Sequence, residues 1–328
     1  MQFADDFNSF LKDVVNLPPG RLDQLGGRVD VLYGAIKKDS TYGALVTGKI
    51  PQGSWAHRTI IKPKDGLEYD ADFLLCVDEN DDWAGDKAQY IEKLYWALGG
   101  AGYQGKCTRK TRCVRVQYAN DSHIDIVPYV DTSIGQRIVN KSTGEWEDTN
   151  PEGFTDWMKK RDDWTSKNFR KVVRLMKYIR DNHGGFEGPR SIILTTLLGQ
   201  RVNQVTSIID PSAYGDVPKA LEKIVSDLDD WLWPLTSMPT VEDPSSPGTS
   251  FNHRWSEESF QHFQRRVHTI SSEITDALKE EDRDESARKW RIVLGDKFKS
   301  TSGERKSSRA FISTAAAGAS LGRSGRAG

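Results

Sequence analysis

Two aspartates separated by a single residue interrupt an apolar stretch, and this arrangement constrains the fold more than any other feature of the chain. The stretch spans residues 69–77 and follows Gly66, a pattern typical of a short strand. Residues two apart on a strand point to the same face, so Asp70 and Asp72 are predicted to place two carboxylates side by side. Carboxylates this close repel each other unless a cation lies between them. Oxygen ligands on a rigid strand suit Mg²⁺, which also binds substrate phosphates.

A third carboxylate, Asp125, occurs in a second short apolar segment. The segment HIDIVP at residues 123–128 predicts a strand that turns Ile124 and Ile126 to one face and Asp125 to the other. An Asp-x-Asp pair alone is common on strands and more often binds no metal than binds one. Three carboxylates from two adjacent strands, however, can hold two metal ions for phosphoryl or nucleotidyl transfer.

A Gly-Ser turn precedes the aspartate pair. Gly53 and Ser54 offer backbone N–H groups and a hydroxyl, and turns of this kind that begin a helix bind phosphate. The turn follows a predicted short strand at residues 44–50. We therefore expect it to lie beside the three carboxylates and to contact a phosphate group.

These motifs together resemble the signature of polymerase-β-type nucleotidyltransferases: Gly53-Ser54, then Asp70-x-Asp72, then Asp125 within Ile-Asp-Ile-Val-Pro-Tyr. The order of the later helices is similar to that of the cyclic GMP-AMP synthase and oligoadenylate synthase branch. More narrowly, the chain resembles the bacterial CD-NTases, the signal synthases of CBASS anti-phage operons, over most of residues 1–300. The resemblance implies an α+β, bilobal fold with a small mixed sheet, flanking helices and a helical C-terminal lobe.

The resemblance also implies a reaction. In such enzymes ATP or GTP donates a nucleotidyl group with release of pyrophosphate, and the product is a cyclic di- or trinucleotide second messenger. Asp70 and Asp72 are expected to hold one Mg²⁺ on the triphosphate, and all three aspartates a second Mg²⁺ near the attacking ribose hydroxyl; Mn²⁺ would suit the same ligands. Ser54 is expected to orient the β- and γ-phosphates, and a downstream effector to bind the product.

Two further nucleotide contacts are carried over from the family. Arg170, Arg174 and Lys177 share one helix face, which is typical of a solvated basic surface. The resemblance instead implies that Lys177 contacts the triphosphate, since a similar Val-Arg-Leu-x-Lys helix does so in the family. Ser191 resembles a serine that contacts nucleotide phosphates, although Ile192 stands where some relatives have an aromatic residue that stacks on the base.

The residues after the Gly-Ser turn depart from the family pattern. Arg58 occupies a position where many relatives carry glycine. Either the local backbone differs from theirs, or Arg58 supplies an extra cation near the triphosphate. His57 is interpreted as structural or solvent-exposed rather than as a general base.

Composition excludes several classes of protein. Among 328 residues, 46 Lys and Arg balance 47 Asp and Glu, so no basic field points to duplex nucleic acid. The mean hydropathy is −0.62 and no apolar run is long enough to span a membrane. The N-terminus lacks the basic and apolar regions of a signal peptide. Three cysteines, an odd number, are expected to be reduced packing residues, which predicts a cytoplasmic protein.

The chain is predicted to divide into a catalytic lobe with N-terminal helices at 1–150, a helical lobe at 151–299 and a disordered tail at 300–328. The catalytic lobe is expected to contain helices at 2–16, 22–36 and 87–98, a single strand at 106–118, a turn at Asn120-Asp121 and a hairpin at 134–146. Asn150-Pro151 predicts the start of a helix. Later helices are expected from Thr165 to a cap at 183–185, and at 189–205, 217–235, 256–278 and 286–298.

The tail ends in Gly328. In some CBASS systems an E1/E2-like partner conjugates the synthase through a small C-terminal residue, and the resemblance extends to this arrangement. The alternative is a terminus without function. For the whole chain, the competing interpretations are a linear oligonucleotide synthase or RNA-tailing polymerase, a non-catalytic nucleotide or RNA sensor on the same fold, and a helical scaffold.

Overall fold

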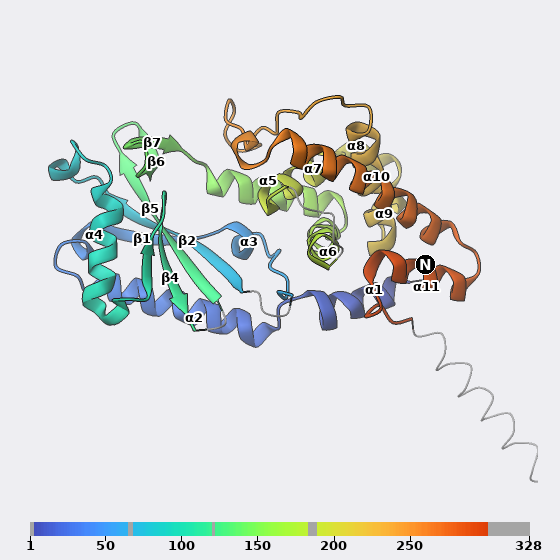
Figure 1. Ribbon diagram of the computed structural model, residues 1–328, viewed down its shortest axis with the longest axis horizontal. Helices are drawn as coiled ribbons and strands as arrows, with labels where there is room; N and C mark the ends of the chain where they lie inside the picture. The colour runs from blue at the N-terminus through green and yellow to red at the C-terminus, as the bar shows by residue number, and fades with distance from the viewer. Residues whose placement is uncertain (1–2, 65–67, 120–121, 183–188, 301–328) are drawn as a thin grey trace, which may run out of the picture.

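A twisted sheet occupies one end of the molecule and a group of helices the other (Figure 1). The computed structural model describes residues 3–64, 68–119, 122–182 and 189–300. In this part of the chain the sheet has seven strands, in the order β1-β2-β5-β4-β3, with β6 paired to β5 and β7 to β6. The strands are β1 (Val46–Gln52), β2 (Tyr69–Asp78), β3 (Cys107–Arg109), β4 (Val114–Tyr118), β5 (Ser122–Thr132), β6 (Gly135–Asn140) and β7 (Glu145–Asp148).

The register of the central strands places polar residues side by side. Strands β2 and β5 are parallel neighbours, and Asp72 pairs with Asp125 across them. On the other side of β5, the antiparallel strand β4 places Arg115 opposite Asp125. Antiparallel β1 ends with Gln52 opposite Asp72, so the chain after β1 begins beside the aspartates.

Alternation along β2 decides which face of the sheet carries the aspartates. Phe73 and Leu75 pack in a core with Ile124 and with Leu25 of α2 (Pro19–Ile36). The helix α4 (Gln89–Leu98) contributes to the same core, so α2 and α4 cover this face. Asp70 and Asp72 have the opposite parity, which turns them to the other face.

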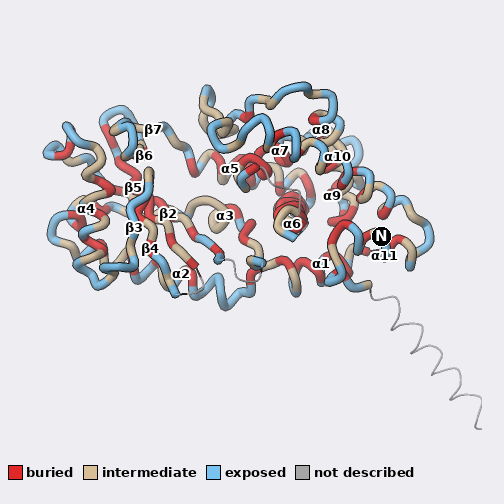
Figure 2. The backbone as a smooth tube through the Cα atoms, viewed as in Figure 1, coloured by how far each residue is buried: buried red, intermediate tan, exposed pale blue. Residues whose placement is uncertain are grey.

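The helical end is built mostly from the second half of the chain. Figure 2 shows buried residues throughout it, including most of α6. Its helices are α5 (Pro151–Trp164), α6 (Phe169–Asn182), α7 (Ser191–Gln200), α8 (Gln204–Ile209), α9 (Val217–Leu232), α10 (Glu257–Lys279) and α11 (Arg283–Leu294).

The first helix of the chain also packs at this end. Phe7 of α1 (Ala4–Phe10) meets the ring of Trp290 edge to face, with centroids 4.8 Å apart. A π-helical turn (Leu11–Val15) continues α1 into the same core. The N-terminal segment therefore contributes to both ends of the molecule, because α1 packs among the helices and α2 packs against the sheet. The division of the chain at residue 150 remains a prediction.

The predicted α+β architecture, with a mixed sheet and a helical C-terminal region, is confirmed. Asn150 caps α5 as expected, since its side chain accepts a hydrogen bond from the Gly153 N–H at 2.9 Å. Ser256 likewise caps α10. Cys76, Cys107 and Cys113 are free thiols. Among the described helices, none combines the length and apolar character needed to cross a bilayer.

Two predicted elements are wrong. The strand expected at 106–118 is split into β3 and β4 by a tight turn, in which the N–H of Lys110 donates to the carbonyl of Cys113 at 2.8 Å. The helix expected at 189–205 ends at Gln200, and Asn203 caps the separate helix α8 by accepting from the Val205 N–H. The predicted turn at 120–121, the cap at 183–185 and the tail at 301–328 lie outside the described residues.

Candidate active site

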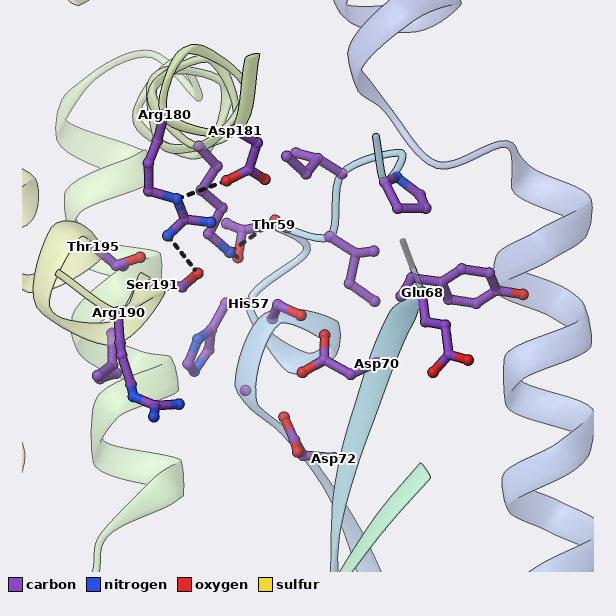
Figure 3. Close-up of a pocket in the computed structure, with 18 of the residues that line it drawn as sticks. His57, Thr59, Glu68, Asp70, Asp72, Arg180, Asp181, Arg190, Ser191 and Thr195 are labelled. Carbon is purple, nitrogen blue, oxygen red and sulfur yellow. Dashed lines mark hydrogen bonds and ion pairs between the residues drawn. The ribbon is translucent and has the colours of Figure 1, made fainter. Parts of the chain in front are cut away.

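A cavity of about 570 Å³ lies between the sheet and the helical end. The sheet side contributes the three aspartates and the Gly-Ser turn, and the helical side contributes α6 and α7. Figure 3 shows side chains from both sides pointing into this space. Every site residue predicted from the sequence lines the cavity: Gly53, Ser54, Asp70, Asp72, Asp125, Lys177 and Ser191.

The aspartates interact electrostatically. Burial is the main cause that raises the pKa of Asp72 to about 8, and the negative charges of Asp70 and Asp125 raise it further. Asp125 retains 13% exposure of its side chain and faces the same cavity. The structure therefore places the three carboxylates along the same cavity.

The glycine of the Gly-Ser turn is required by two features of its surroundings. Gly53 begins the short helix α3 (Gly53–Ala56) and has a φ of 62°, in the left-handed region that favours glycine. A Cβ at this position would overlap Oδ2 of Asp72. The turn can therefore approach the aspartates closely only because residue 53 has no side chain.

Arg115 binds the third aspartate directly. Its Nε donates to Oδ1 of Asp125, and its Nη2 donates to Oδ2, both at 2.7 Å. Such a two-pronged pair between a guanidinium and a carboxylate is among the stronger hydrogen-bonding arrangements in proteins. Asp125 therefore has both oxygens engaged by a cation of the chain itself.

Lys177 is buried rather than solvated. Only 5% of the residue is exposed, and its Nζ donates to the carbonyl of Thr59 at 3.0 Å and to Oγ1 of Thr59 at 3.3 Å. Burial, followed by the charge of Arg180, lowers the pKa of Lys177 to about 8. The interpretation of this helix face as a solvated basic surface is wrong at Lys177, because the loop after α3 packs over it.

Ser191 occupies the first position of α7 on the helical side of the cavity. Its Oγ accepts a hydrogen bond from Nη1 of Arg180 at 3.1 Å, and Nε of Arg180 donates to Asp181 at 2.8 Å (Figure 3). Ile192 lines the cavity beside it. Arg180 therefore connects α6 to the start of α7 at the edge of the cavity.

Comparison with known proteins decides the family. Residues 1–162 match the family model described as Second Messenger Oligonucleotide or Dinucleotide Synthetase domain. The chain carries the synthetase domain of the CD-NTase family. The predicted family and the nucleotidyltransferase class are thereby confirmed.

Relatives of this CD-NTase include two curated synthases. A cyclic AMP-AMP-AMP synthase from Acinetobacter sp. is 23% identical over 297 residues, covering 89% of this chain and 84% of the relative. A c-di-GMP synthase from Roseivirga ehrenbergii is 24% identical over 289 residues, covering 77% and 74%.

Solved structures share the fold. Vibrio cholerae DncV, a cyclic AMP-GMP synthase, superposes with a TM-score of 0.71 at 16% identity, covering 91% of this chain and 97% of DncV. Escherichia coli MS115-1 CdnC, solved with ATP, has a TM-score of 0.70 at 19% identity, covering 90% and 98%. At these identities the likeness establishes the fold alone.

The donor set of the CD-NTase site fits divalent cations. Carboxylate oxygens are the ligands that Mg²⁺ prefers. Burial and, after it, the negative charges of Asp70 and Asp125 raise the pKa of Asp72, and a cation bound beside it would favour its ionised form. Within the ranges that the structure describes, no three His, Cys, Asp or Glu side chains are positioned so that they could hold a metal ion without rearrangement. The engagement of Asp125 by Arg115 is consistent with that finding.

His57 is buried, so the solvent-exposed interpretation is wrong. Its ring lies 4.9 Å from the ring of Phe154 of α5, and 7% of the residue is exposed. Burial, with a contribution from Lys177, lowers the pKa of His57 to about 4. The imidazole is therefore neutral at physiological pH and forms part of the cavity wall.

Arg58 adopts a backbone conformation that suits glycine. Its φ is 57°, and its carbonyl accepts a hydrogen bond from Nη1 of Arg174 at 2.7 Å. The Arg58 side chain is exposed and is not among the residues that line the cavity. Of the two interpretations of this departure, the structure favours the one that concerns the backbone.

Four arginines that line the cavity were not predicted as site residues from the sequence: Arg115, Arg180, Arg190 and Arg254. Arg115 alternates with apolar residues on β4, but which residue it meets depends on the register of β4 with β5. Arg190 directly precedes Ser191, and Arg254 comes from the connection before α10. In the described part of the chain, no acceptor or carboxylate pairs with the side chain of Arg190 or Arg254, which leaves both able to meet an anion.

Proposed function

We propose that this CD-NTase joins nucleoside triphosphates into a cyclic di- or trinucleotide second messenger that acts in anti-phage defence. The observation that carries the proposal is that Asp70, Asp72 and Asp125 line one cavity. The Gly-Ser turn lies beside them, and a side chain at Gly53 would overlap Asp72. This is the donor set needed for metal-assisted nucleotidyl transfer. The synthase names of the relatives support the same reaction class.

In this proposal the aspartates bind the metal ions. Asp70, Asp72 and Asp125 would hold two Mg²⁺ or Mn²⁺ ions, which would lower the pKa of the attacking ribose hydroxyl and neutralise charge on the leaving pyrophosphate. The sheet fixes the spacing of the three carboxylates, because Asp72 and Asp125 are in register on paired strands. Fixed ligands of this kind need little rearrangement when the substrate arrives.

Side chains on both walls of the cavity would bind the substrate. Ser54 would donate its hydroxyl to the β- or γ-phosphate, and Lys177 would contribute a point charge from α6. Ser191, Arg190 and Arg254 would bind further phosphate oxygens from the helical side. His57 is neutral, so it would help to exclude water rather than carry a proton.

Partners of the chain follow from the same proposal. ATP, GTP or another NTP would be the substrate, in line with relatives solved with ATP and with a nonhydrolysable GTP. An effector would bind the product, and an E1/E2-like partner would act on Gly328. CdnC has been solved in complex with a HORMA protein, so relatives also form protein complexes.

The test is product analysis. The protein is incubated with all four NTPs and Mg²⁺, the products are treated with phosphatase and linkage-specific nucleases, and the masses are measured. A phosphatase-resistant cyclic product supports the proposal. A linear product would indicate an oligonucleotide synthase or RNA-tailing polymerase, and binding without turnover would indicate a sensor; either result contradicts cyclisation.

A further inference from the structure

We propose that Arg115 is an internal counter-cation that holds Asp125 in the nucleotide-free enzyme and must release it before the second metal ion binds. The inference rests on the proposed function and assigns an order to the assembly of its site. It makes Arg115 a positioning residue that acts through Asp125.

The geometry of the pair is the first support. Both Asp125 oxygens receive a hydrogen bond of 2.7 Å, from Nε and from Nη2 of the same guanidinium. Arg115 and Asp125 are directly opposite each other in the register of β4 with β5. The strand pairing therefore holds the two residues in contact without help from any ligand.

The distribution of charge is the second support. Three carboxylates face the cavity, and the guanidinium of Arg115 is bound to one of them. Asp70 and Asp72 have no comparable partner among the described residues, so a first divalent ion is attracted to them. A second ion that needs Asp125 must compete with a cation already hydrogen-bonded to both of its oxygens. In the nucleotide-free protein, Asp70 and Asp72 can therefore bind a first ion, whereas Arg115 blocks the second ion from Asp125.

Release of Asp125 requires only a side-chain rotation. The Arg115 side chain is 32% exposed and itself lines the cavity, so open space lies next to it. The backbone of β4 stays paired to β5 throughout. Incoming nucleotide and metal would supply the new partners that make the exchange favourable.

A second arginine fork, between the β3–β4 turn and β7, provides a matched control. Arg112 binds Glu147 through Nε at 2.5 Å and Nη2 at 2.8 Å, so the pair has the same geometry as Arg115 with Asp125. Neither Arg112 nor Glu147 lines the cavity. Removal of this fork tests what the loss of an arginine pair does to the protein without touching the three aspartates.

The experiment measures Mn²⁺ binding to the nucleotide-free protein by calorimetry and by electron paramagnetic resonance. Wild type is expected to bind one ion in the accessible range. Arg115→Gln should bind a second ion and bind Mn²⁺ roughly tenfold more tightly, because a positive charge a few ångströms from the ions is removed. Arg115→Lys, which keeps the charge but loses the fork, should fall between them, and Arg112→Gln should match wild type.

Asp125→Asn in the Arg115→Gln background should abolish the gained ion, which ties the effect to this pair. Thermal unfolding in EDTA checks that each variant is folded. Wild-type binding in folded Arg115→Gln and Arg115→Lys would overturn the inference and leave the proposed function intact. If neither wild type nor any variant binds Mn²⁺ even with ATP present, the metal-dependent function itself fails.

Discussion

Gly53 and Asp72 are so close that a Cβ on the glycine would overlap Oδ2 of the aspartate. The two residues come from different elements, the turn after β1 and the strand β2, whose ends lie side by side in the sheet. Because Gly53 also has a φ of 62°, the contact depends on glycine for two independent reasons. It connects the proposed phosphate-binding turn to the proposed metal ligands.

We expect Gly53→Ala to abolish most nucleotidyl transfer while the fold is kept. The methyl group must displace Asp72 or the turn, and misplacement of about 1 Å at a reacting centre can cost on the order of 100-fold in rate. Initial rates of product formation measure the effect. Gly48→Ala in β1, the strand that precedes the turn, is the control, since its Cβ would meet Cys76 at an ordinary 3.8 Å. Equal activity in both variants would show that the contact is not needed.

The polar centre of this site was largely predictable from the sequence, and its surroundings were not. Period-two alternation identifies the faces of β2 and β5 that carry Asp70, Asp72 and Asp125, because that pattern is local. The ion pair of Arg115 depends on strand register, and the burial of His57 depends on Phe154 from a helix nearly a hundred residues further along the chain. Such contacts form between different elements of the fold, so the local sequence pattern does not predict them.

Asp72 predicts a pH dependence of stability in the metal-free protein. A carboxyl whose pKa is raised from its ordinary value to about 8 favours the folded state when protonated, so its contribution to stability declines as pH rises through this interval. Asp72→Asn should remove the decline and raise the Tm relative to wild type at pH 8 in EDTA. Asp78→Asn, at the exposed end of the same strand, should leave the profile unchanged. Parallel pH profiles for wild type and Asp72→Asn would contradict the assignment.

Lys177 predicts the pH dependence of nucleotide affinity. Its pKa, lowered to about 8, means that the ammonium is charged below that pH and increasingly neutral above it. ATP binding should therefore weaken as pH rises through 8, and Lys177→Met should bind at least roughly tenfold more weakly with that dependence removed. Equilibrium binding of a nonhydrolysable ATP analogue from pH 6.5 to 9 measures this. Lys171→Met on the same helix should retain the wild-type profile, and a flat wild-type profile would exclude the role of Lys177.

The variant Arg58→Gly distinguishes the two explanations for the arginine at this position, a backbone that differs from the family's or an extra cation near the triphosphate. Relief of the left-handed conformation favours the variant by about 1 kcal/mol or more, and the added freedom of the unfolded chain offsets part of this gain. We expect stability in urea to be unchanged or slightly increased and product formation to be retained. Loss of nucleotide affinity in a folded Arg58→Gly protein would instead identify the guanidinium as a cation of the substrate site.

The most direct test of the account replaces the three carboxylates by amides of the same shape. Asp70→Asn, Asp72→Asn and Asp125→Asn are each incubated with NTPs and Mg²⁺, and products are quantified by mass spectrometry beside wild type and Asp78→Asn. The account predicts that each of the three lowers product formation by a factor of roughly 1,000 or more while the protein stays folded, because each removes a proposed ligand of a catalytic metal ion. A folded variant of Asp70, Asp72 or Asp125 that forms product at the wild-type rate would contradict it.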